Sequence, residues 1–459
     1  MTDSTSRQSC PTLFVTAPAS GQGKTTITAG LARFFARQGK VVRVFKTGPD
    51  YLDPQILAQA SGQPVEQLDM WMAGPEYCQQ KLYEAAAVAD LILIEGAMGM
   101  FDGEPSSADL AAYFNIPMAI VMDVKGMAQT AAAVAAGLAG FRQDITVAGL
   151  IANNCGSERH AQLIHDALPA TLPLLATLAR NEAVALPERH LGLVQAAEVY
   201  DQLEDCFDAA ADWLAGSGFS LSGHAVTDLP AAVAFSAGRI EQPEKLLAGR
   251  HIAIARDQAF SFIYQDNLRL LEAMGARLSF FSPLSDTQLP RDVDAIWLPG
   301  GYPELHGAAL AANHSIKACL VEHHGEHKPI LAECGGFLYC LETLTDLGEQ
   351  QHSMLGLLDG HGWMRGKRGC QGMQTAMLSE GEVRAHAHHR SRSTGTTEPV
   401  SHGRRQRHPA PGEAIYQQRG LTASYLHLFF ASNPTAIAAL LGAHNSQSVV
   451  LPEHFDNVG

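Results

Sequence analysis

The order of features between residues 13 and 35 decides the fold of the N-terminal half. An apolar run at residues 13–16 is followed by APASGQGKTTITAGLARFF, residues 17–35, which is a glycine-rich turn and then a helical pattern. Glycines let a backbone wrap phosphates closely, the following lysine reaches the β- and γ-phosphates, and the next hydroxyl ligates Mg²⁺. The N-terminus of the helix adds a partial positive charge. The stretch therefore predicts a phosphate-binding loop for ATP, made by Gly21, Gly23, Lys24, Thr25 and Thr26.

One position departs from the GxxxxGK[ST] pattern of such loops. Pro18 stands where the pattern has its first glycine. The alternative interpretation is a glycine-rich turn that only joins a strand to a helix. Because strand, loop and helix occur in the required order, we favour the phosphate-binding interpretation.

Both halves of the chain alternate short β-rich runs with helical stretches such as residues 25–38 and 127–140. Continuous apolar strands separated by helices predict a parallel sheet that is covered on both faces. A second α/β alternation starts at residue 251. The expected strands are residues 13–16, 41–46, 91–95, 118–123 and 147–153 in the first half, and 251–255, 277–281, 295–298 and 329–332 in the second.

The length of 459 residues exceeds what one core usually holds, so we expect two main domains. Residues 196–249 are acidic and helical and then rich in Gly, Ser and Pro, which is typical of a boundary. We therefore expect an N-terminal domain over residues 1–195, a helical and linker segment over 196–249, and a C-terminal domain over 250–459. The polar stretch 394–412, with many Arg, His and Pro residues, is expected to be an exposed loop.

The composition excludes several classes of protein. The formal net charge of -15 argues against a general nucleic-acid binder, which needs a basic surface. No apolar run reaches the roughly 18 residues of a membrane span, and the polar start MTDSTSRQSC does not suggest a signal peptide. The 8 cysteines are scattered, which is typical of buried thiols in a cytoplasmic protein.

Acidic residues follow the ends of two expected strands. KTGPDYLDP begins at Lys46 and carries Asp50 and Asp53, and EGAMGMFDG begins at Glu95 and carries Asp102. Ligands of open α/β sheets bind at the carboxyl ends of the strands. Carboxylates there, beside a phosphate-binding loop, are well placed to hold Mg²⁺ on ATP, although a single loop acid is more often a turn or cap residue.

A cysteine in the second half occupies a strand-to-helix turn. Cys334 follows an expected strand and precedes Gly335 and Gly336, so a sharp turn would expose the thiol at a helix N-terminus. Most free cysteines, such as Cys340 on the following apolar helix, are simply buried hydrophobes. The best candidate for a base is His427 in ASYLHLFFASNP. No orienting carboxylate follows it two residues later, where Phe429 stands.

Two further segments could contribute to a site around Cys334. PGGYPELH follows an expected strand, and its adjacent Gly300 and Gly301 could present N–H groups to an oxyanion, together with Gly335, or could form only a tight turn. His386, His388 and His389 form a cluster, but no Cys or acid completes a recognisable metal-ligand spacing. We therefore interpret the cluster as a surface or substrate contact.

These segments together resemble a known family. GPDYLDP, EGAMGMFDG, LPERHLGL (residues 186–193), ARDQAFSFIYQDNL (255–268), PGGYPEL, AECGG and ASYLHL are similar, in this order, to signature segments of cobyrinate and hydrogenobyrinate a,c-diamide synthases. The resemblance covers nearly the whole chain. The chain departs from the family where a GHEFHYS-like run is replaced by AHAHHRS, residues 385–391, and where HLHF is replaced by HLFF.

The resemblance implies an α/β protein with an N-terminal P-loop domain of the dethiobiotin-synthetase-like type and a C-terminal class I glutamine amidotransferase-like domain. It implies an ATP-dependent ligase of cobalamin biosynthesis that uses glutamine-derived ammonia and Mg²⁺ with ATP, and it is compatible with a homodimer. The implied roles are catalysis by Cys334 and His427; metal binding by Thr25, Asp50 and Glu95; substrate contact by Tyr51, Leu52 and Asp102; and anion contact by Arg189 and His190.

Three alternatives remain open at this point. Cobyric acid synthase amidates other side chains of the same ring, although LPERHLGL and AFSFIYQDNL speak against it. Dethiobiotin synthetase has a similar P-loop domain but no second domain with a CGG turn. A non-enzymatic partitioning ATPase often carries a further lysine near the start of the loop, where this chain has Ala19. The resemblance does not distinguish a cobalt-containing ring from a metal-free one.

Overall fold

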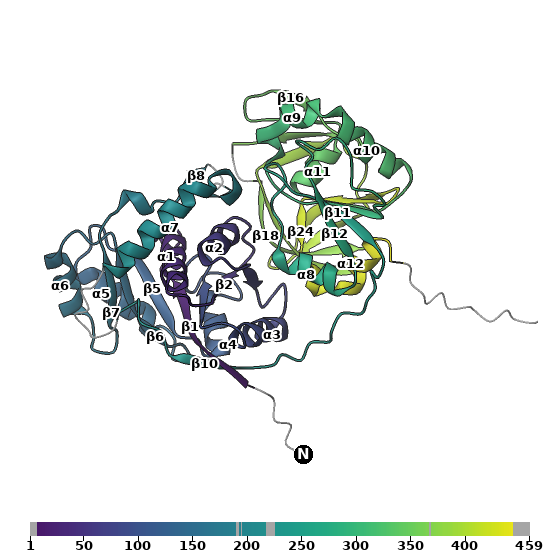
Figure 1. Cartoon of the computed structure of the whole chain (residues 1–459). Helices are drawn as coiled ribbons and strands as arrows, with labels where there is room; N and C mark the ends of the chain where they lie inside the picture. Colours follow the sequence, from purple (N-terminus) through teal and green to yellow (C-terminus); the bar gives the residue numbers. More distant parts are fainter. Residues whose placement is uncertain (1–6, 190–191, 194, 217–224, 367–368, 444–459) are drawn as a thin grey trace, which may run out of the picture. The chain divides into compact units, whose positions relative to one another are not determined.

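The computed structural model describes residues 7–189, 192–193, 195–216, 225–366 and 369–443, and it divides into two compact units. Unit 1 is Met1–Gln242 with Ser261–Leu268, and unit 2 is Pro243–Phe260 with Arg269–Gly459. The chain therefore passes into unit 2, returns briefly to unit 1, and ends in unit 2 (Figure 1). Within the described part of the chain, no helix is both long and apolar enough to cross a membrane.

The core of unit 1 is a parallel sheet in the strand order β3-β2-β4-β1-β5-β6-β7, with β10 antiparallel to β1 at its start. The expected strands are all present, and β3, β7 and β10 are additional. The strands are β1 (Arg7–Thr16), β2 (Val42–Thr47), β3 (Glu66–Leu68), β4 (Leu91–Glu95), β5 (Met118–Asp123), β6 (Val147–Asn153), β7 (Leu174–Leu178) and β10 (Ala232–Ser236).

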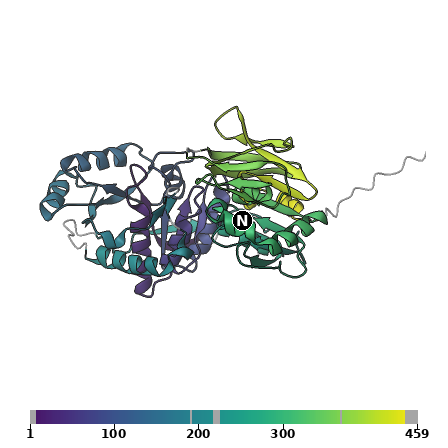
Figure 2. The ribbon, with the colours of Figure 1, turned by 90° about the horizontal axis from the view of Figure 1, so that it is seen from above.

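Helices cover both faces of this sheet because successive side chains of a strand point to opposite faces. On β1, Phe14 belongs to one apolar cluster, and its neighbours Leu13 and Val15 belong to another. Figure 2 shows helices on both sides of this sheet. The first cluster includes α3 (Pro75–Ala86), α4 (Ser107–Phe114), α5 (Gln129–Gly140) and α6 (Glu158–Ala167). The second includes α1 (Lys24–Arg37), α2 (Asp53–Ser61) and α7 (Tyr200–Ala215).

The segment after residue 195 is not a separate linker up to Gln242. Helix α7 lies against α1 so closely that a Cβ on Gly30 would lie 2.7 Å from Cδ1 of Leu214. The ion pair between Arg33 and Glu204, with an N–O distance of 2.8 Å, joins the same two helices. The chain then forms β10, whose pairing with β1 anchors it to the sheet. Most of residues 196–249, expected to be a helical and linker segment, thus belongs to unit 1.

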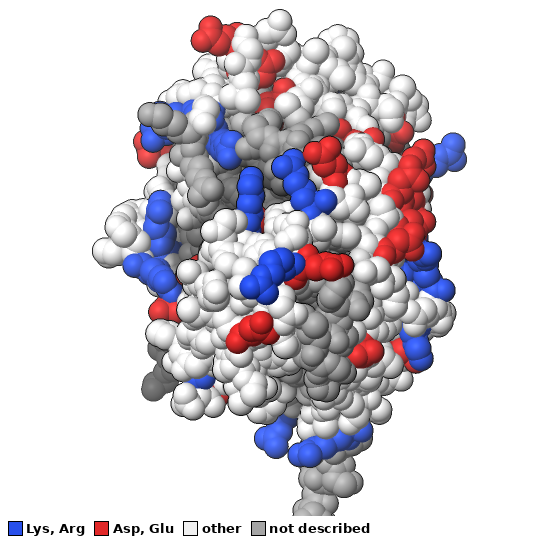
Figure 3. All heavy atoms as spheres, turned by 90° about the vertical axis from the view of Figure 1, so that its left-hand side faces the viewer, with Lys and Arg blue, Asp and Glu red and all other residues white. Residues whose placement is uncertain are grey.

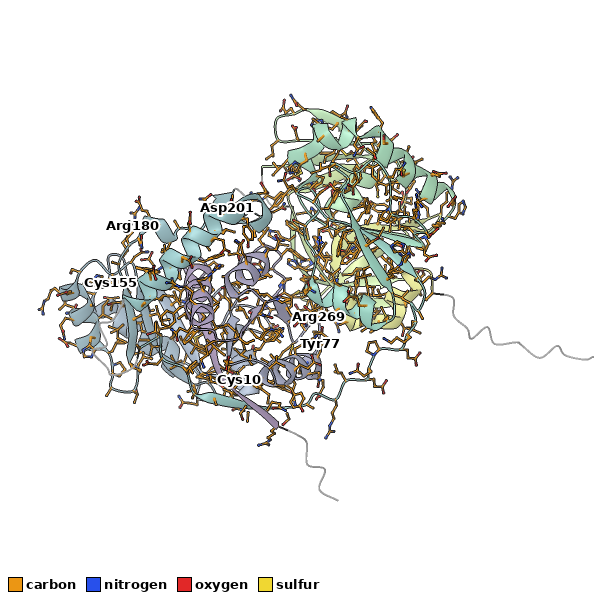
Figure 4. The ribbon with its side chains drawn as sticks, in the orientation of Figure 1. Cys10, Tyr77, Cys155, Arg180, Asp201 and Arg269 are labelled. Carbon is orange, nitrogen blue, oxygen red and sulfur yellow. The ribbon has the colours of Figure 1, made fainter. Side chains whose placement is uncertain are left out.

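The segment Ser261–Leu268, expected in the C-terminal domain, also belongs to unit 1. The ring of Phe262 stacks on Tyr51 with centroids 5.1 Å apart, and the hydroxyl of Tyr264 donates to that of Tyr51 at 2.9 Å. The carboxylate of Asp266 is buried and accepts from the Gln67 backbone N–H at 3.0 Å and from the Tyr77 hydroxyl at 2.7 Å. Tyr77 is on α3 and is labelled in Figure 4. These contacts, made far apart in sequence, could not be read from local patterns.

Unit 2 contains a sheet in the order β12-β11-β13-β14-β23-β22-β21-β18-β19-β24. Its first part, through β23, is parallel, and the remainder is antiparallel. The strands are β11 (His251–Ala255), β12 (Arg277–Phe281), β13 (Ala295–Leu298), β14 (Ile330–Glu333), β18 (Cys370–Leu378), β19 (Gly381–His389), β21 (Ser401–Arg405), β22 (Pro411–Gln418), β23 (Leu421–Ser424) and β24 (Leu426–Leu428).

The remaining elements of unit 2 surround this sheet. They are the helices α8 (Gln265–Ala273), which begins in unit 1, α9 (Gly307–Ala312), α10 (His314–Gly325), α11 (Gly335–Cys340) and α12 (Pro434–Leu440), and a small sheet of β15 (Thr343–Thr345), β16 (Gln351–Ser353), β17 (His361–Met364) and β20 (Ser391–Thr394). The expectation that residues 394–412 form only an exposed loop is wrong. This polar stretch contains β21, whose main-chain pairing with β18 and β22 does not require apolar side chains.

Acidic and basic side chains both occur in small groups on the face drawn in Figure 3. The cysteines are free thiols, among them the buried Cys10 and Cys155 (Figure 4).

The buried carboxylate of Asp266 gives a test of how the segment Ser261–Leu268 is held. Burial raises the pKa of Asp266 to about 6, so the acid depends on its donors. Tyr77→Phe removes one of them, and we expect unfolding of unit 1 to become easier by about 1–3 kcal/mol. Thermal and denaturant unfolding would measure this, with Tyr113→Phe on the exposed side of α4 as the control. Equal stability of the two variants would contradict the account.

Candidate active sites

The glycine-rich turn of unit 1 is held by the ends of neighbouring strands. Gly21 and Gly23 have φ angles of 77° and 94°, which favour glycine. A Cβ on Gly23 would lie 2.5 Å from Nδ2 of Asn153, which donates to the carbonyl of Gln22 at 3.0 Å. The side chain of Gln22 in turn accepts from the backbone N–H of Asp123 at 2.9 Å. The ends of β5 and β6 thus fix the loop that opens into α1.

The lysine of the loop is largely buried. Lys24 is 8% exposed, and its ammonium donates to the carbonyls of Met98 at 2.8 Å and Ala19 at 3.4 Å. Burial lowers its pKa, and the nearby Lys46 lowers it further. Thr25 and Thr26 follow on the first turn of α1 and are half-buried. Bonding of Lys24 to loop carbonyls holds its charge where a phosphate would lie.

A buried ionic cluster lies next to the loop at the ends of β2 and β4. The ammonium of Lys46 lies 2.6 Å from Oε1 of Glu95 and 2.7 Å from Oδ2 of Asp53. The hydroxyl of Thr25 donates to the same Oε1 at 2.9 Å. Asp50 accepts from the N–H groups of Leu52 and Asp53 at 3.0 Å each, at the start of α2.

This cluster fits a hard divalent cation. Oε2 of Glu95 is buried and accepts no hydrogen bond, so one carboxylate oxygen beside Thr25 is available to a ligand. Burial and the charge of Asp53 raise the pKa of Asp50 to about 7, while the charge of Lys46 acts in the opposite direction. Hydroxyl and carboxylate oxygens are the donors that such cations prefer. The structure brings Thr25 and Glu95 into direct contact and places Asp50 beside Lys46, and it adds Asp53, which the predicted metal set omitted.

The residues predicted to contact substrate differ in exposure. Tyr51 and Leu52 are 6% and 9% exposed, and the ring of Tyr51 packs in the contact with Phe262 described above. Asp102 is exposed and accepts from the backbone N–H of Gly99 at 3.1 Å. Of the predicted anion contacts, His190 and the side chain of Arg189 lie outside the described residues.

In unit 2, Cys334 occupies a sharp turn between β14 and α11. Its φ and ψ angles of 46° and -99° are strained for a residue with a side chain, as in a nucleophile elbow. Its N–H donates to the Ser424 carbonyl at 2.8 Å, and its thiol lies 3.9 Å from the carbonyl of His388. Burial raises the pKa of the thiol, the charge of Glu304 raises it further, and the Gly335 amide acts the other way. The resting thiol is therefore neutral.

The predicted base is buried on β24. His427 is 1% exposed and pairs in register with His386 on β19. Burial lowers its pKa well below the usual range, and His386, His388 and His389 lower it further, so the imidazole is neutral and can accept a proton. The residue after His427 donates its N–H to Oε1 of Glu333, the residue before Cys334, at 2.7 Å. The structure thus links the segments that carry the two predicted catalytic residues.

The three predicted oxyanion glycines gather at this place. A Cβ on Gly300 would lie 2.2 Å from Cε1 of His427. A Cβ on Gly335 would lie 2.9 Å from the backbone nitrogen of Gly301 and 3.0 Å from Cδ of Pro303. Only glycine allows backbones and a ring to approach this closely. Gly300 therefore lies against the ring of His427, and Gly335, which follows Cys334, lies against Gly301.

The interpretation of the histidine cluster needs correction. His386 is 4% exposed and so is no surface contact. An acid and a cysteine do accompany His389 in space: ligand atoms of Cys370, His389 and Glu413 lie within 4.8 Å of one another. They come from separate strands, which a search for sequence spacing could not detect. Nε2 of His389 lies 3.4 Å from Oε2 of Glu413, a contact that becomes an ion pair when the imidazole is protonated.

Comparison with known families agrees with both sites. Residues 13–194 match the model of the CobQ/CobB/MinD/ParA nucleotide binding domain, and residues 251–435 match the CobB/CobQ-like glutamine amidotransferase domain. A nucleotide-binding domain joined to a glutamine amidotransferase domain defines an amide-forming ligase, as the sequence had predicted.

Similar proteins with curated names show to which family within this class the chain belongs. The chain is 51% identical to hydrogenobyrinate a,c-diamide synthase of Stutzerimonas stutzeri over 95% of this chain and 99% of that one. It is 48% identical to the protein of the same name from Pseudomonas aeruginosa, over 94% and 97%. It is 44% identical to cobyrinate a,c-diamide synthase of Herminiimonas arsenicoxydans, over 93% and 96%. The chain belongs to the family of cobyrinate and hydrogenobyrinate a,c-diamide synthases, which confirms the resemblance.

The close approach of Gly300 to His427 generates a prediction. In Gly300→Ala the new methyl must displace the imidazole, and we expect glutamine hydrolysis to fall by about a hundredfold or more, since displacements of about 1 Å have such effects. Gly325→Ala at the end of α10 is the matched control, because a Cβ there meets nothing within 4 Å. Glutaminase rates measure the effect, and circular dichroism checks the fold. Normal hydrolysis in Gly300→Ala would refute the described geometry.

Proposed function

We propose that this chain converts the a and c carboxylates of hydrogenobyrinate or cobyrinate into carboxamides, with glutamine as the nitrogen donor and ATP hydrolysis as the driving reaction. The observation that carries the proposal is the presence of two differently built sites in one chain of this family. One is a phosphate-binding loop beside buried carboxylates, and the other is a strained cysteine whose strand is joined to that of a histidine.

The glutaminase reaction follows from the neutral pair in unit 2. The sulfur of Cys334 attacks the carboxamide carbon of glutamine while the thiol proton passes to His427. The oxyanion that forms lies against the N–H groups of Gly300, Gly301 and Gly335. The C–N bond breaks as His427 returns the proton to nitrogen, and ammonia leaves a thioester on Cys334. Water then hydrolyses the thioester, which releases glutamate and restores the thiol.

The ligase reaction uses the site in unit 1. A substrate carboxylate attacks the γ-phosphorus of ATP, the bond to the β-phosphate oxygen breaks, and ADP and an acyl phosphate form. Lys24 stabilises the transferred phosphoryl group, and Gly21, Gly23 and Thr26 hold the phosphates. Ammonia then attacks the acyl carbon, loses a proton, and expels phosphate, giving the carboxamide. Each amidation consumes one ATP and one glutamine.

Mg²⁺ fits the oxygen donors of this site. Thr25, Glu95 and Asp50 would hold it, and when bound it would neutralise phosphate charge. Tyr51, Leu52 and Asp102 remain the proposed substrate-side residues. Asp102 is exposed and could meet a ligand directly, whereas Tyr51 and Leu52 would act mainly by shaping the edge of the site, since both are mostly buried.

The experiment that tests the proposal offers the purified protein ATP, Mg²⁺, glutamine and either ring, and follows the corrinoid by mass spectrometry. We expect two successive replacements of a carboxyl OH by NH₂ on one of the rings. If neither hydrogenobyrinate nor cobyrinate changes in mass although ATP is hydrolysed, the proposed substrate class is refuted.

Two variants separate the half-reactions. Cys334→Ala should lose glutamine-dependent amidation at least about a thousandfold, because the nucleophile is removed, and should keep amidation from ammonium salts. Lys24→Ala should lose both activities by about a hundredfold or more, because the phosphoryl group loses its cation. Glutamine-dependent amidation by Cys334→Ala at the normal rate would show that the nucleophile is misassigned.

A further inference from the structure

A charged residue ends the otherwise apolar strand β14. Glu333 in the sequence ILAE is 2% exposed, and both of its carboxylate oxygens accept a hydrogen bond. Oε1 accepts from the backbone N–H of Leu428 on β24 at 2.7 Å, and Oε2 accepts from the indole N–H of Trp297 on β13 at 2.9 Å. One side chain therefore joins β14 to two other strands.

Each of these partners is adjacent to a part of the glutaminase site. Cys334 directly follows Glu333, and His427 directly precedes Leu428. Trp297 is separated only by Leu298 and Pro299 from Gly300. Cys334, His427 and Gly300 thus each lie within three residues of Glu333 or of a residue that is bonded to its carboxylate.

The arrangement supplies what the sequence around His427 lacks. In cysteine–histidine sites a third group orients the base. The position two residues after His427 is Phe429, which cannot orient it with a carboxylate. Glu333 instead fixes the main chain of β24 beside His427, so it acts on the base through the backbone.

The burial of Glu333 argues that its role is more than filling space. Burial raises its pKa to about 8, and the N–H donors of Leu428 and Trp297 act the other way. A buried acid is unfavourable unless its oxygens are satisfied, whereas an apolar residue of the same size would pack in this core without that requirement. The acid provides directional hydrogen bonds to two strands, which an apolar residue cannot form.

We propose that Glu333 is a positioning residue of the glutaminase, holding the strand of His427 and the loop of Gly300 in place around Cys334. Glu333 does not touch the reacting atoms, and it acts through the segments it bonds. The proposal rests on the proposed glutaminase function of unit 2.

The test compares Glu333→Gln and Glu333→Leu with the wild-type full-length chain, in steady-state amidation with glutamine and, separately, with ammonium salts. Leu fills the space without accepting a bond, whereas Gln keeps the shape and one acceptor oxygen. We expect kcat with glutamine to fall about tenfold in Glu333→Gln and about a hundredfold in Glu333→Leu, with KM for glutamine changed less than about threefold. Glu322→Gln, on the exposed face of α10, is the charge-matched control and should behave as wild type.

A second variant guards against a folding defect. Trp297→Phe keeps an aromatic ring in the core, removes the indole donor and leaves some space unfilled, so the thermal midpoint should fall. Below that midpoint, kcat with glutamine should fall severalfold while the ammonia-dependent rate stays near that of wild type. A kcat within twofold of wild type in both Glu333→Gln and Trp297→Phe would overturn the proposal. So would an equal loss of the glutamine- and ammonia-dependent rates, which is what a structural role predicts. Absence of amidation from both glutamine and ammonia in the wild-type chain would instead refute the proposed function.

Discussion

In each unit, a carboxylate at the last position of a buried parallel strand organises the site. Glu95 ends β4 and Glu333 ends β14, and they are 0% and 2% exposed. Burial raises the pKa of both, and each carboxylate accepts hydrogen bonds from neighbouring segments. Those donors are the reacting residues or their neighbours: Thr25 and Lys46 for Glu95, and Leu428 for Glu333. The contacts that make the buried acids tolerable are therefore the contacts that give the sites their geometry.

Burial also makes the glutaminase site unreactive before substrate binds. Burial disfavours the thiolate of Cys334 and the imidazolium of His427, so the stable form of the pair is neutral on both sides. A neutral thiol reacts slowly with oxidants and stray electrophiles. In the proposed mechanism, charge separation becomes favourable only when a bound carboxamide receives the sulfur and the glycine N–H groups receive the oxyanion.

The sequence predicted the parts of this molecule that depend on neighbours along the chain. The phosphate-binding loop, the turn at Cys334 and the strands that precede them follow from short patterns of glycine, apolar and helix-forming residues. Contacts between distant strands were not predictable in this way. Glu333 is visible in the sequence only as an acid in an apolar strand, and its partners are unknown until β13, β14 and β24 are assembled. The proximity of Cys370 and Glu413 to His389 in the folded chain was not predicted for the same reason. The pairing of β10 with β1 was not predicted either.

The segment Ser261–Leu268 has a consequence for how such proteins can be divided or recombined. A gene cut at the boundary that composition suggests would leave this segment on the wrong fragment. The C-terminal piece would expose Phe262 and Tyr264 to water, and the N-terminal piece would lack the acid that Tyr77 and the Gln67 backbone bond. Exposed aromatic rings favour aggregation. Because the segment lies between two parts of unit 2 in the sequence, a version made of two separate chains would carry it as an internal segment of the C-terminal chain, which would then have to bind the N-terminal chain.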